Sequence, residues 1–245
     1  MGYCYLESGD EFFILPDESF HAASTMKVCV LMELFHQAAL GERSLNDQVT
    51  IRNEFASIVD GSPFSVGEDD DSEKSFHHRI GESESLIGLA KPMITHSSNL
   101  ATNLLVDKLG ADRITAFMKA LGAPGLTVLR GVEDGKAYRL GINNTVTARG
   151  LTTIMARLGK GEVVSRSASE AMLEILHSQT HRDSIPAGVP EGTRVANKTG
   201  WNDGICHDCG VVFPPNRPPY ALTVLTRGLD QPTASQLIAS ISRIG

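Results

Sequence analysis

The stretch His21-Ala-Ala-Ser-Thr-Met-Lys-Val-Cys-Val30, with the apolar run that continues it to Ala39, decides how the chain is organised. From Thr25 onward the residues favour a helix, and few of them are polar, which is typical of a helix buried on nearly all sides. Ser24 lies at the N-terminal end of this helix, where unpaired backbone N–H groups and the positive end of the helix dipole meet. Lys27 follows three residues later, so its amine shares a face with the Ser24 hydroxyl.

Ser24 and Lys27 have the spacing that a serine nucleophile and its base require. An amine inside an apolar helix loses part of its preference for the charged form. A neutral amine can take the proton of a nearby serine hydroxyl, which activates the serine for attack. A Ser-x-x-Lys spacing also arises by chance in a chain of this length, so this interpretation depends on further motifs.

The bulk composition limits the classes of function. The chain has 245 residues, of which 41% are hydrophobic and 21% are charged, as in ordinary soluble globular proteins. A formal net charge of −7 without a basic tract disfavours nucleic acid and anionic membranes as partners. No apolar run approaches the roughly 20 residues that a membrane span needs. We expect a small-molecule substrate and a monomer.

The N-terminus and the cysteines bear on compartment and metal binding. Segment 1–7 has neither a basic region nor a long apolar stretch, so no signal peptide is visible. The protein is then cytoplasmic if the sequence is full-length, and periplasmic or secreted if it is a processed form. Cys206 and Cys209 form a C-x-x-C without a second pair, and on one strand they would point to opposite faces. We therefore expect reduced structural cysteines that hold no metal.

Strand-like segments occupy both ends of the chain, and helical segments occupy the middle. Strands are predicted at about 2–7, 11–15, 195–199, 209–213 and 220–227. Helices are predicted at about 25–39, 99–109, 111–121, 147–158, 167–177 and 233–244. The economical arrangement is an α+β fold, in which a five-stranded antiparallel sheet from both termini is flanked by helices as an α/β sandwich. The α/β sheet domain comprises residues 1–22 and 178–245, and residues 23–177 form an all-helical domain inserted between these two segments.

Two irregular regions lie inside the helical part. The acidic run Glu68-Asp-Asp-Asp71 is predicted to be a solvated loop, and His77-His78 are predicted to be surface histidines. Residues 122–146 are rich in glycine and asparagine, which predicts a long shaped loop. A loop of this length in a compact protein is more often functional than accidental.

Three short polar motifs follow one another along the chain: Ser24-Thr-Met-Lys27, Ser97-Ser-Asn99 and Lys198-Thr-Gly200. Each has a plain structural interpretation, because the second resembles a helix cap and the third a strand end. In this order, and each on the expected kind of element, they indicate a single site for acyl transfer.

On these motifs the chain resembles the class A β-lactamase-like serine hydrolases, and the likeness covers almost the whole sequence. It includes Asn103, four residues after Asn99, and Asn144-Thr-Val-Thr-Ala148. Residues of about 130–144 resemble the Ω-loop of that family. The resemblance implies a β-lactamase-like fold and an enzyme that hydrolyses β-lactams, as in antibiotic resistance, without a cofactor.

The resemblance implies a catalytic role for three residues. Ser24 attacks a carbonyl and becomes acylated, Lys27 helps to remove its proton, and Ser97 relays a proton to the leaving nitrogen. Acyl transfer requires a nucleophile beside a base, which agrees with this assignment.

Five further residues match the substrate-binding positions of the family. Asn99 is expected to bond the amide side chain of the substrate, and Lys198 and Thr199 to face its carboxylate. Gly200 leads to Trp201, whose backbone N–H would hold the oxyanion together with the N–H of the nucleophile. A helix N-terminus facing a strand edge supplies two such donors, and a cation with a hydroxyl suits an anionic substrate.

The 130–144 loop departs from the family pattern at the residues that release the acyl group. Glu133 is the best candidate for the base that activates water, with Asp134 second. Glu133 lies one place later after Arg130 than the pattern requires, and Ala137 stands where an asparagine is usual. Asn144 replaces the aspartate that normally pairs with the arginine of the loop.

A fourth departure is Ser98, which stands where the family usually has aspartate and which we interpret as a structural change. Three functions remain open. The first is β-lactam hydrolysis through an acyl-enzyme on Ser24. The second is an esterase or D-alanyl peptidase with little β-lactam turnover, and the third is a non-catalytic binding protein that retains the fold.

Overall fold

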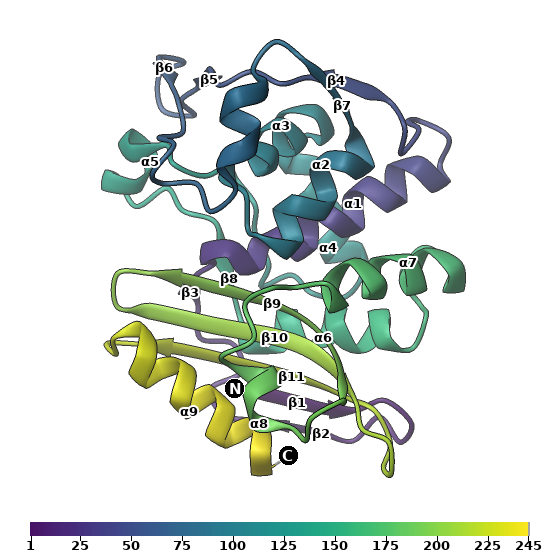
Figure 1. Cartoon of the computed structure of the whole chain (residues 1–245). Helices are drawn as coiled ribbons and strands as arrows, with labels where there is room; N and C mark the ends of the chain where they lie inside the picture. The colour runs from purple at the N-terminus through teal and green to yellow at the C-terminus, as the bar shows by residue number, and fades with distance from the viewer. Residues whose placement is uncertain (245) are drawn as a thin grey trace.

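A five-stranded antiparallel sheet joins the two ends of the chain in the computed structural model, which describes residues 1–244. Its strands are β1 (Gly2–Tyr5), β2 (Glu11–Phe13), β9 (Arg194–Asn202), β10 (Ile205–Phe213) and β11 (Tyr220–Arg227). They lie in the order β2-β1-β11-β10-β9, so β1 pairs with the last strand of the chain (Figure 1). The predicted sheet built from both termini is confirmed.

Strands β9 and β10 are longer than predicted. The sequence predicts that the first ends at residue 199, because Gly200-Trp-Asn-Asp-Gly204 resembles a turn, but β9 continues to Asn202 and the chain turns at Asp203-Gly204. Gly204 has φ +67°, which a residue without a Cβ adopts readily. Because β9 continues past Lys198, the third motif lies within an edge strand instead of at its end.

Side chains alternate between the two faces of the sheet, as the period of two requires. Val195 belongs to the apolar cluster under α8 (Ile185–Gly188) and α9 (Gln231–Ile244), whereas the next residue, Ala196, belongs to the larger cluster under the other helices. Cys206 and Cys209 divide in the same way, and both are free thiols. The prediction of two reduced cysteines on opposite faces is therefore confirmed.

Most of the remaining helices form the upper part of Figure 1, and α6 lies behind the sheet. They are the 3₁₀ turn η1 (Ala23–Met26), α1 (Lys27–Ala39), α2 (Leu86–Thr95), α3 (Asn99–Leu109), α4 (Ala111–Ala120), α5 (Gly135–Arg139), α6 (Ala148–Gly159) and α7 (Arg166–His177). Side chains cap several of them; for example, the Thr147 hydroxyl accepts from Gly150 N–H at the start of α6.

Helix α1 lies at the centre of the helical layer (Figure 1). Apolar residues from Val28 to Leu34 are fully buried, and so are the polar side chains of Lys27 and Gln37. The Gln37 amide donates to Glu33 Oε1 at 2.7 Å and to Leu109 O at 2.9 Å, which satisfies its buried hydrogens. The prediction of a helix buried on nearly all sides is confirmed, with a 3₁₀ turn as its first turn.

Short strand pairs fasten the connecting segments. They are β3 (Phe20–His21) with β8 (Thr145–Val146), β4 (Gln48–Thr50) with β7 (Ser83–Ser85), and β5 (Phe55–Ala56) with β6 (Pro63–Phe64). A further 3₁₀ turn, η2, spans Lys74–Arg79. The β3–β8 pair matters most for the site, because it ties the end of the 130–144 loop to the residues just before Ser24.

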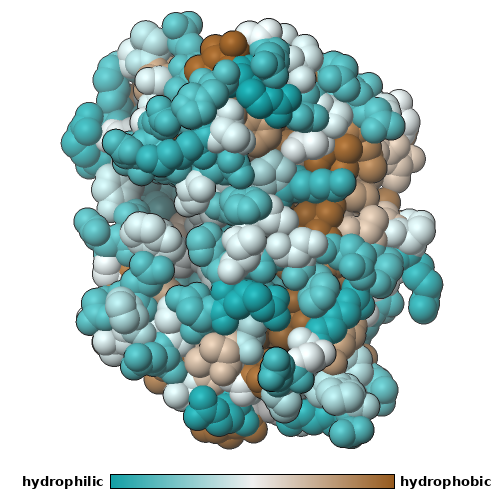
Figure 2. Space-filling view, in the orientation of Figure 1, coloured by the Kyte–Doolittle hydropathy of each residue, from teal (hydrophilic) through white to brown (hydrophobic). Residues whose placement is uncertain are grey.

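The face shown in Figure 2 is mostly hydrophilic, with apolar residues exposed in small patches. Among residues 1–244, no helix is both long enough and apolar enough to cross a bilayer. Within the same residues, no group of three or more His, Cys, Asp and Glu side chains is arranged to hold a metal ion.

Candidate active site

Ser24 lies in η1, half-buried, where the chain enters the central helix. The preceding residue, Ala23, has φ +45°, an uncommon conformation for a residue with a Cβ. Neighbouring bonds hold this turn in place. Ala22 N–H donates to Asn144 O at 2.8 Å, and the Thr25 hydroxyl donates to Ala22 O at 2.5 Å. The serine is therefore fixed at a helix N-terminus that is fastened to the end of the 130–144 loop.

The Lys27 side chain is fully buried beside this turn. Its Nζ donates to Ser97 O at 2.8 Å, Ser97 Oγ at 3.0 Å and Asn99 Oδ1 at 2.8 Å. Burial, followed by the nearby positive charge of Lys198, places the pKa of Lys27 well below the usual value for an amine, although the charges of Asp71 and Glu133 oppose this. The lowered pKa makes the neutral form of this amine easier to reach, which suits Lys27 to act as a base.

Lys198 approaches the same hydroxyl from β9. Its Nζ donates to Ser97 Oγ at 3.2 Å and to Thr199 O at 2.9 Å, and its side chain is also fully buried. Burial lowers the pKa of Lys198 to about 8, against the opposing effect of Asp208. Ser97 has φ +63° and lies between the two amines, so its hydroxyl can pass a proton between them and a bound substrate.

Gly200 brings β9 into close contact with η1. A Cβ added at Gly200 would lie 2.8 Å from Ser24 N, 2.9 Å from Thr25 N and 3.2 Å from Ala23 Cβ. Only a residue without a side chain allows the strand edge to approach the first turn so closely. The next residue, Trp201, has 58% of its surface exposed at the open end of the strand.

Asn99 connects the lysine to the 130–144 loop. While Oδ1 accepts from Lys27, Nδ2 donates to Glu133 Oε1 at 3.0 Å and to Asp70 O at 2.9 Å. A side-chain amide has two hydrogens to donate, and both are used here. Asn99 therefore holds the predicted base of acylation and the predicted base of deacylation in one hydrogen-bonded chain.

Glu133 reaches Asn99 although it lies one residue later than the family pattern requires. Asn103 binds the backbone of the preceding residue, with Val132 N–H donating to its Oδ1 at 2.6 Å and its Nδ2 donating to Val132 O at 3.0 Å. Glu133 then has φ +63°, and its carboxylate points to Asn99. Burial and the charge of Asp70 raise the pKa of Glu133 above the usual value for a carboxyl.

Asp134 lies outside this network. Its buried carboxylate accepts from Ser57 Oγ at 3.0 Å, Ile58 N at 3.1 Å and Ala137 N at 3.1 Å. Burial alone would raise the pKa of Asp134, but these hydrogen bonds hold it below the usual value. Asp134 caps α5 and anchors the neighbouring loop, so it does not fit as the alternative base.

Hydrogen bonds, and not an ion pair, join the two ends of the 130–144 loop. Asn144 Oδ1 accepts from Leu129 N at 2.8 Å and Arg130 N at 3.2 Å, and its Nδ2 donates to Arg130 O at 2.9 Å. The Arg130 guanidinium donates to Ile142 O at 2.8 Å and to Asn143 Oδ1 at 2.9 Å. Hydrogen bonds made by the Asn144 side-chain amide and the Arg130 guanidinium thus connect the two ends of the loop.

Two buried acids near the site did not follow from the sequence. Asp71 was predicted to be solvated, yet only 2% of its surface is exposed, and the ring of His77 beside it is also largely covered. The one sequence signal for a buried Asp71 is that Ser98 stands where the resemblance predicts an aspartate. Asp208 belongs to β10, and its carboxylate accepts from Asn197 Nδ2 of the neighbouring strand β9 at 3.0 and 3.1 Å. The sequence signal that could have identified it is an acidic residue inside an otherwise apolar strand.

The chain matches known proteins over nearly its full length. A family model described as "Beta-lactamase enzyme family" matches residues 1–244. A beta-lactamase of Streptomyces albus G is 30% identical over 162 residues, which cover 64% of this chain and 52% of that protein. The matched segment therefore spans about half the length of this relative.

Two solved structures are similar over 99% of the chain. A beta-lactamase from Sphaerobacter thermophilus has a TM-score of 0.84 and 26% identity, with 88% of its own chain covered. The protein PBP-A has a TM-score of 0.81 and 27% identity, with 86% covered. A variant of PBP-A has been solved as an acyl-enzyme complex with penicillin G.

Proposed function

The chain belongs to the beta-lactamase enzyme family, and on that premise we propose that it hydrolyses β-lactams through an acyl-enzyme on Ser24. The observation that carries this proposal is the partly buried chain of hydrogen bonds from Lys198 through Ser97 to Lys27 and Asn99. Two amines of lowered pKa that share one hydroxyl form a proton path beside a helix N-terminus.

In the first half of the reaction, Ser24 Oγ attacks the lactam carbonyl carbon and forms a C–O bond. The serine proton moves to the neutral Lys27 amine, and the oxyanion lies between the backbone N–H groups of Ser24 and Trp201. The C–N bond then breaks. Ser97 gives its proton to the leaving nitrogen and regains one from Lys27.

In the second half, Glu133 removes a proton from a water molecule whose oxygen attacks the ester carbon. The C–O bond to Ser24 breaks, and Ser24 regains a proton as Glu133 returns to its ionised form. The bond from Asn99 to Glu133 supports this role, because it keeps the carboxylate in the same network as Lys27. A raised pKa also makes Glu133 a stronger base for this step.

A second candidate function is an esterase or D-alanyl peptidase with little β-lactam turnover. The observation in its favour is that the backbone bound by Asn103 belongs to Val132, so Glu133 reaches the site only by a left-handed turn. If Asn99 retains the carboxylate during the reaction, water is not activated and the acyl group stays on Ser24.

A chromogenic cephalosporin and an aryl ester, each assayed with wild type and Ser24→Ala, test the proposal. We expect cephalosporin turnover that Ser24→Ala reduces at least about 1,000-fold, because the nucleophile is lost. Ser240→Ala, a change at an exposed serine of α9, is the matched control and should leave turnover unchanged. Ester cleavage without cephalosporin turnover would favour the second candidate. If Ser24→Ala retained the wild-type rate on both, a different nucleophile would have to be found.

A further inference from the structure

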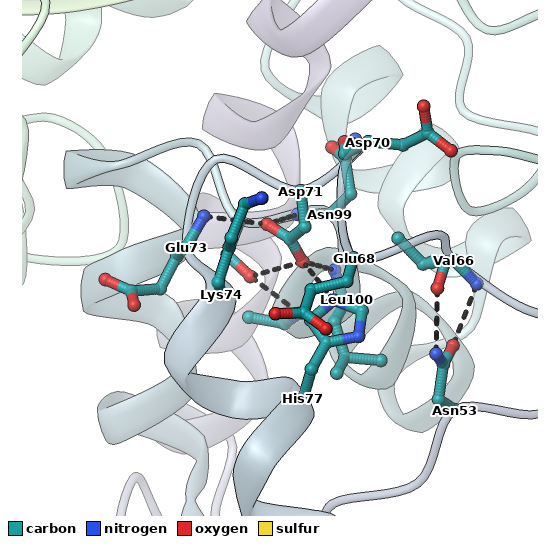
Figure 3. Close-up of polar contacts among 12 residues, drawn as sticks. Asn53, Val66, Glu68, Asp70, Asp71, Glu73, Lys74, His77, Asn99 and Leu100 are labelled. Carbon is teal, nitrogen blue, oxygen red and sulfur yellow. Dashed lines mark hydrogen bonds and ion pairs between the residues drawn. The ribbon is translucent and has the colours of Figure 1, made fainter.

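The carboxylate of Asp71 lies at the N-terminus of α3, the helix that begins with Asn99 (Figure 3). It accepts from Asn99 N–H at 3.0 Å and from Leu100 N–H at 2.8 Å, and the Ser98 hydroxyl donates to it at 3.3 Å. Glu73 N–H donates to the same carboxylate at 3.0 Å. An acid that comes from a separate segment thus receives the first two N–H groups of the helix.

These bonds satisfy groups that the helix leaves unpaired. The first N–H groups of a helix have no partner inside it, and the positive end of the dipole favours an anion there. Ser98 Oγ caps the third of them, since Ala101 N–H donates to it at 3.2 Å. A buried serine accepts weakly and carries no charge, so Asp71 supplies the anion that Ser98 lacks.

The segment around Asp71 fixes Asn99 at two points. Asp71 receives its backbone N–H, and the carbonyl of Asp70 receives a hydrogen of its side-chain amide at 2.9 Å. The other end of that amide accepts from Lys27 at 2.8 Å. A displacement of the 70–71 backbone would therefore move Asn99 and, through it, the Lys27 amine.

The structure around Asp71 is built to hold it. His77 Nε2 lies 3.4 Å from Asp71 Oδ2, and 7% of the His77 side chain is exposed (Figure 3). Before the acidic run, both polar atoms of the Asn53 side-chain amide bind the backbone of Val66. Nδ2 donates to Val66 O, and Val66 N–H donates to Oδ1, each at 2.8 Å. The segment is thus held at Val66 and again at the turn η2.

We propose that Asp71, which lies 28 residues before Asn99, is a positioning residue for the reaction at Ser24, because its carboxylate holds the start of α3 and with it Asn99. Asp71 does not touch the substrate; it acts through Asn99. This inference rests on the proposed function, because it needs Ser24 to be acylated in the wild type.

The test compares Asp71→Asn with Asp69→Asn in the rate at which penicillin G acylates Ser24, measured by quenched-flow intact mass. Both changes remove one negative charge from the same segment, but the Asp69 side chain is 98% exposed and pairs with Lys74 at the surface. An amide at position 71 has one oxygen to accept the bonds, and its hydrogens face donors. We expect Asp71→Asn to acylate about 100-fold more slowly, as a displacement of catalytic groups by about 1 Å does, and Asp69→Asn to match the wild type.

A second pair of variants separates positioning from folding. Asp71→Ser should acylate slowly, and the exchange Asp71→Ser with Ser98→Asp should recover at least about tenfold, because an aspartate at the cap position accepts from the first turn directly. Thermal unfolding confirms that each variant is folded at the assay temperature. The proposal is overturned if folded Asp71→Asn acylates at the wild-type rate, or if the exchange acylates no faster than Asp71→Ser. If the wild type itself shows no adduct, the proposed function fails instead.

Discussion

At the scale of single residues, Asn99 determines how the site is arranged. Its amide receives one bond from Lys27 and donates one bond each to Glu133 and Asp70, so no hydrogen is left over for a substrate. A substrate amide that accepts a hydrogen bond from Asn99 must therefore replace either Glu133 or Asp70 as the acceptor. The bonds to Glu133 and to Asp70 both lie at the exposed side, and the loss of the bond to Glu133 would free that carboxylate to bind water.

The pKa of Lys198, lowered to about 8, predicts how substrate binding depends on pH. Below about pH 8 the amine is charged and attracts an anion, and above it the charge is lost. We therefore expect KM for penicillin G, an anion, to rise as the pH passes from 7 to 9. KM for a neutral aryl ester should change little over the same range.

Steady-state assays of both substrates from pH 6 to 9.5 check this prediction. Parallel changes in KM for the anionic and the neutral substrate would show that Lys198 does not bind the carboxylate.

At this scale the sequence predicted the residues that lie on recurring motifs. The family resemblance assigned Ser24, Lys27 and Ser97 through their short motifs, and the structure brings Lys27 and Ser97 into contact. Their catalytic roles stay predictions. Asp71 could not be assigned in this way, because its role depends on a fold that brings it to a helix start 28 residues away. An acidic run has the same appearance in a sequence whether its last member is solvated or buried.

At the scale of elements, the contact between η1 and β9 shapes the place where we propose that the oxyanion binds. Gly200 lies against the backbone N–H groups of Ser24 and Thr25, and a Cβ there would approach both to less than 3.0 Å. The backbones of turn and strand cannot yield as a flexible side chain would. The two elements must therefore move apart if the glycine is replaced.

Gly200→Ala should slow acylation by about 100-fold, because the donors for the oxyanion separate and one such donor contributes that much. Stopped-flow acylation with a chromogenic cephalosporin measures the rate, and thermal unfolding shows whether the variant is folded. Wild-type acylation by a folded Gly200→Ala would mean that this strand edge does not form the oxyanion site.

Elements were predicted well where the pattern is long and periodic. The central helix and the helices after residue 99 lie where their apolar periods and caps predicted them. The end of β9 was misplaced because Gly200-Trp-Asn resembles a turn, whereas pairing with β10 keeps these residues in the strand. The short pairs such as β3 with β8 are set by tertiary contacts and leave too little pattern to detect.

At the scale of the whole molecule, a sheet from both termini holds the helical layer against β9. Asp208 is buried between β9 and α8, where Ile185 N–H donates to it at 2.9 Å and Asn197 at 3.0 and 3.1 Å. Burial raises the pKa of Asp208 to about 7, against the bonds that favour its ionised form. Ionisation of this acid therefore acts against the folded state.

The sign of the effect follows from linkage. The folded pKa is raised, so the stability from this group is complete below its ordinary value and is lost as the pH rises through about 7. Asp208→Asn cannot ionise. We expect the Tm of the variant to gain on that of the wild type between pH 5 and 7.5, measured by scanning calorimetry. A constant difference in Tm over this range would contradict a buried, titrating Asp208.

The central claim is that Ser24 is acylated and that Glu133 helps to release the acyl group. Intact-mass spectrometry after mixing with penicillin G tests it directly on the wild type and on Glu133→Gln. We expect the wild type to return to its unmodified mass, and Glu133→Gln to retain one penicilloyl group on Ser24 at least about 100 times longer, since general-base catalysis contributes that much. Equal release by both proteins would contradict the role of Glu133, and the absence of any adduct in either would contradict the acyl-enzyme itself.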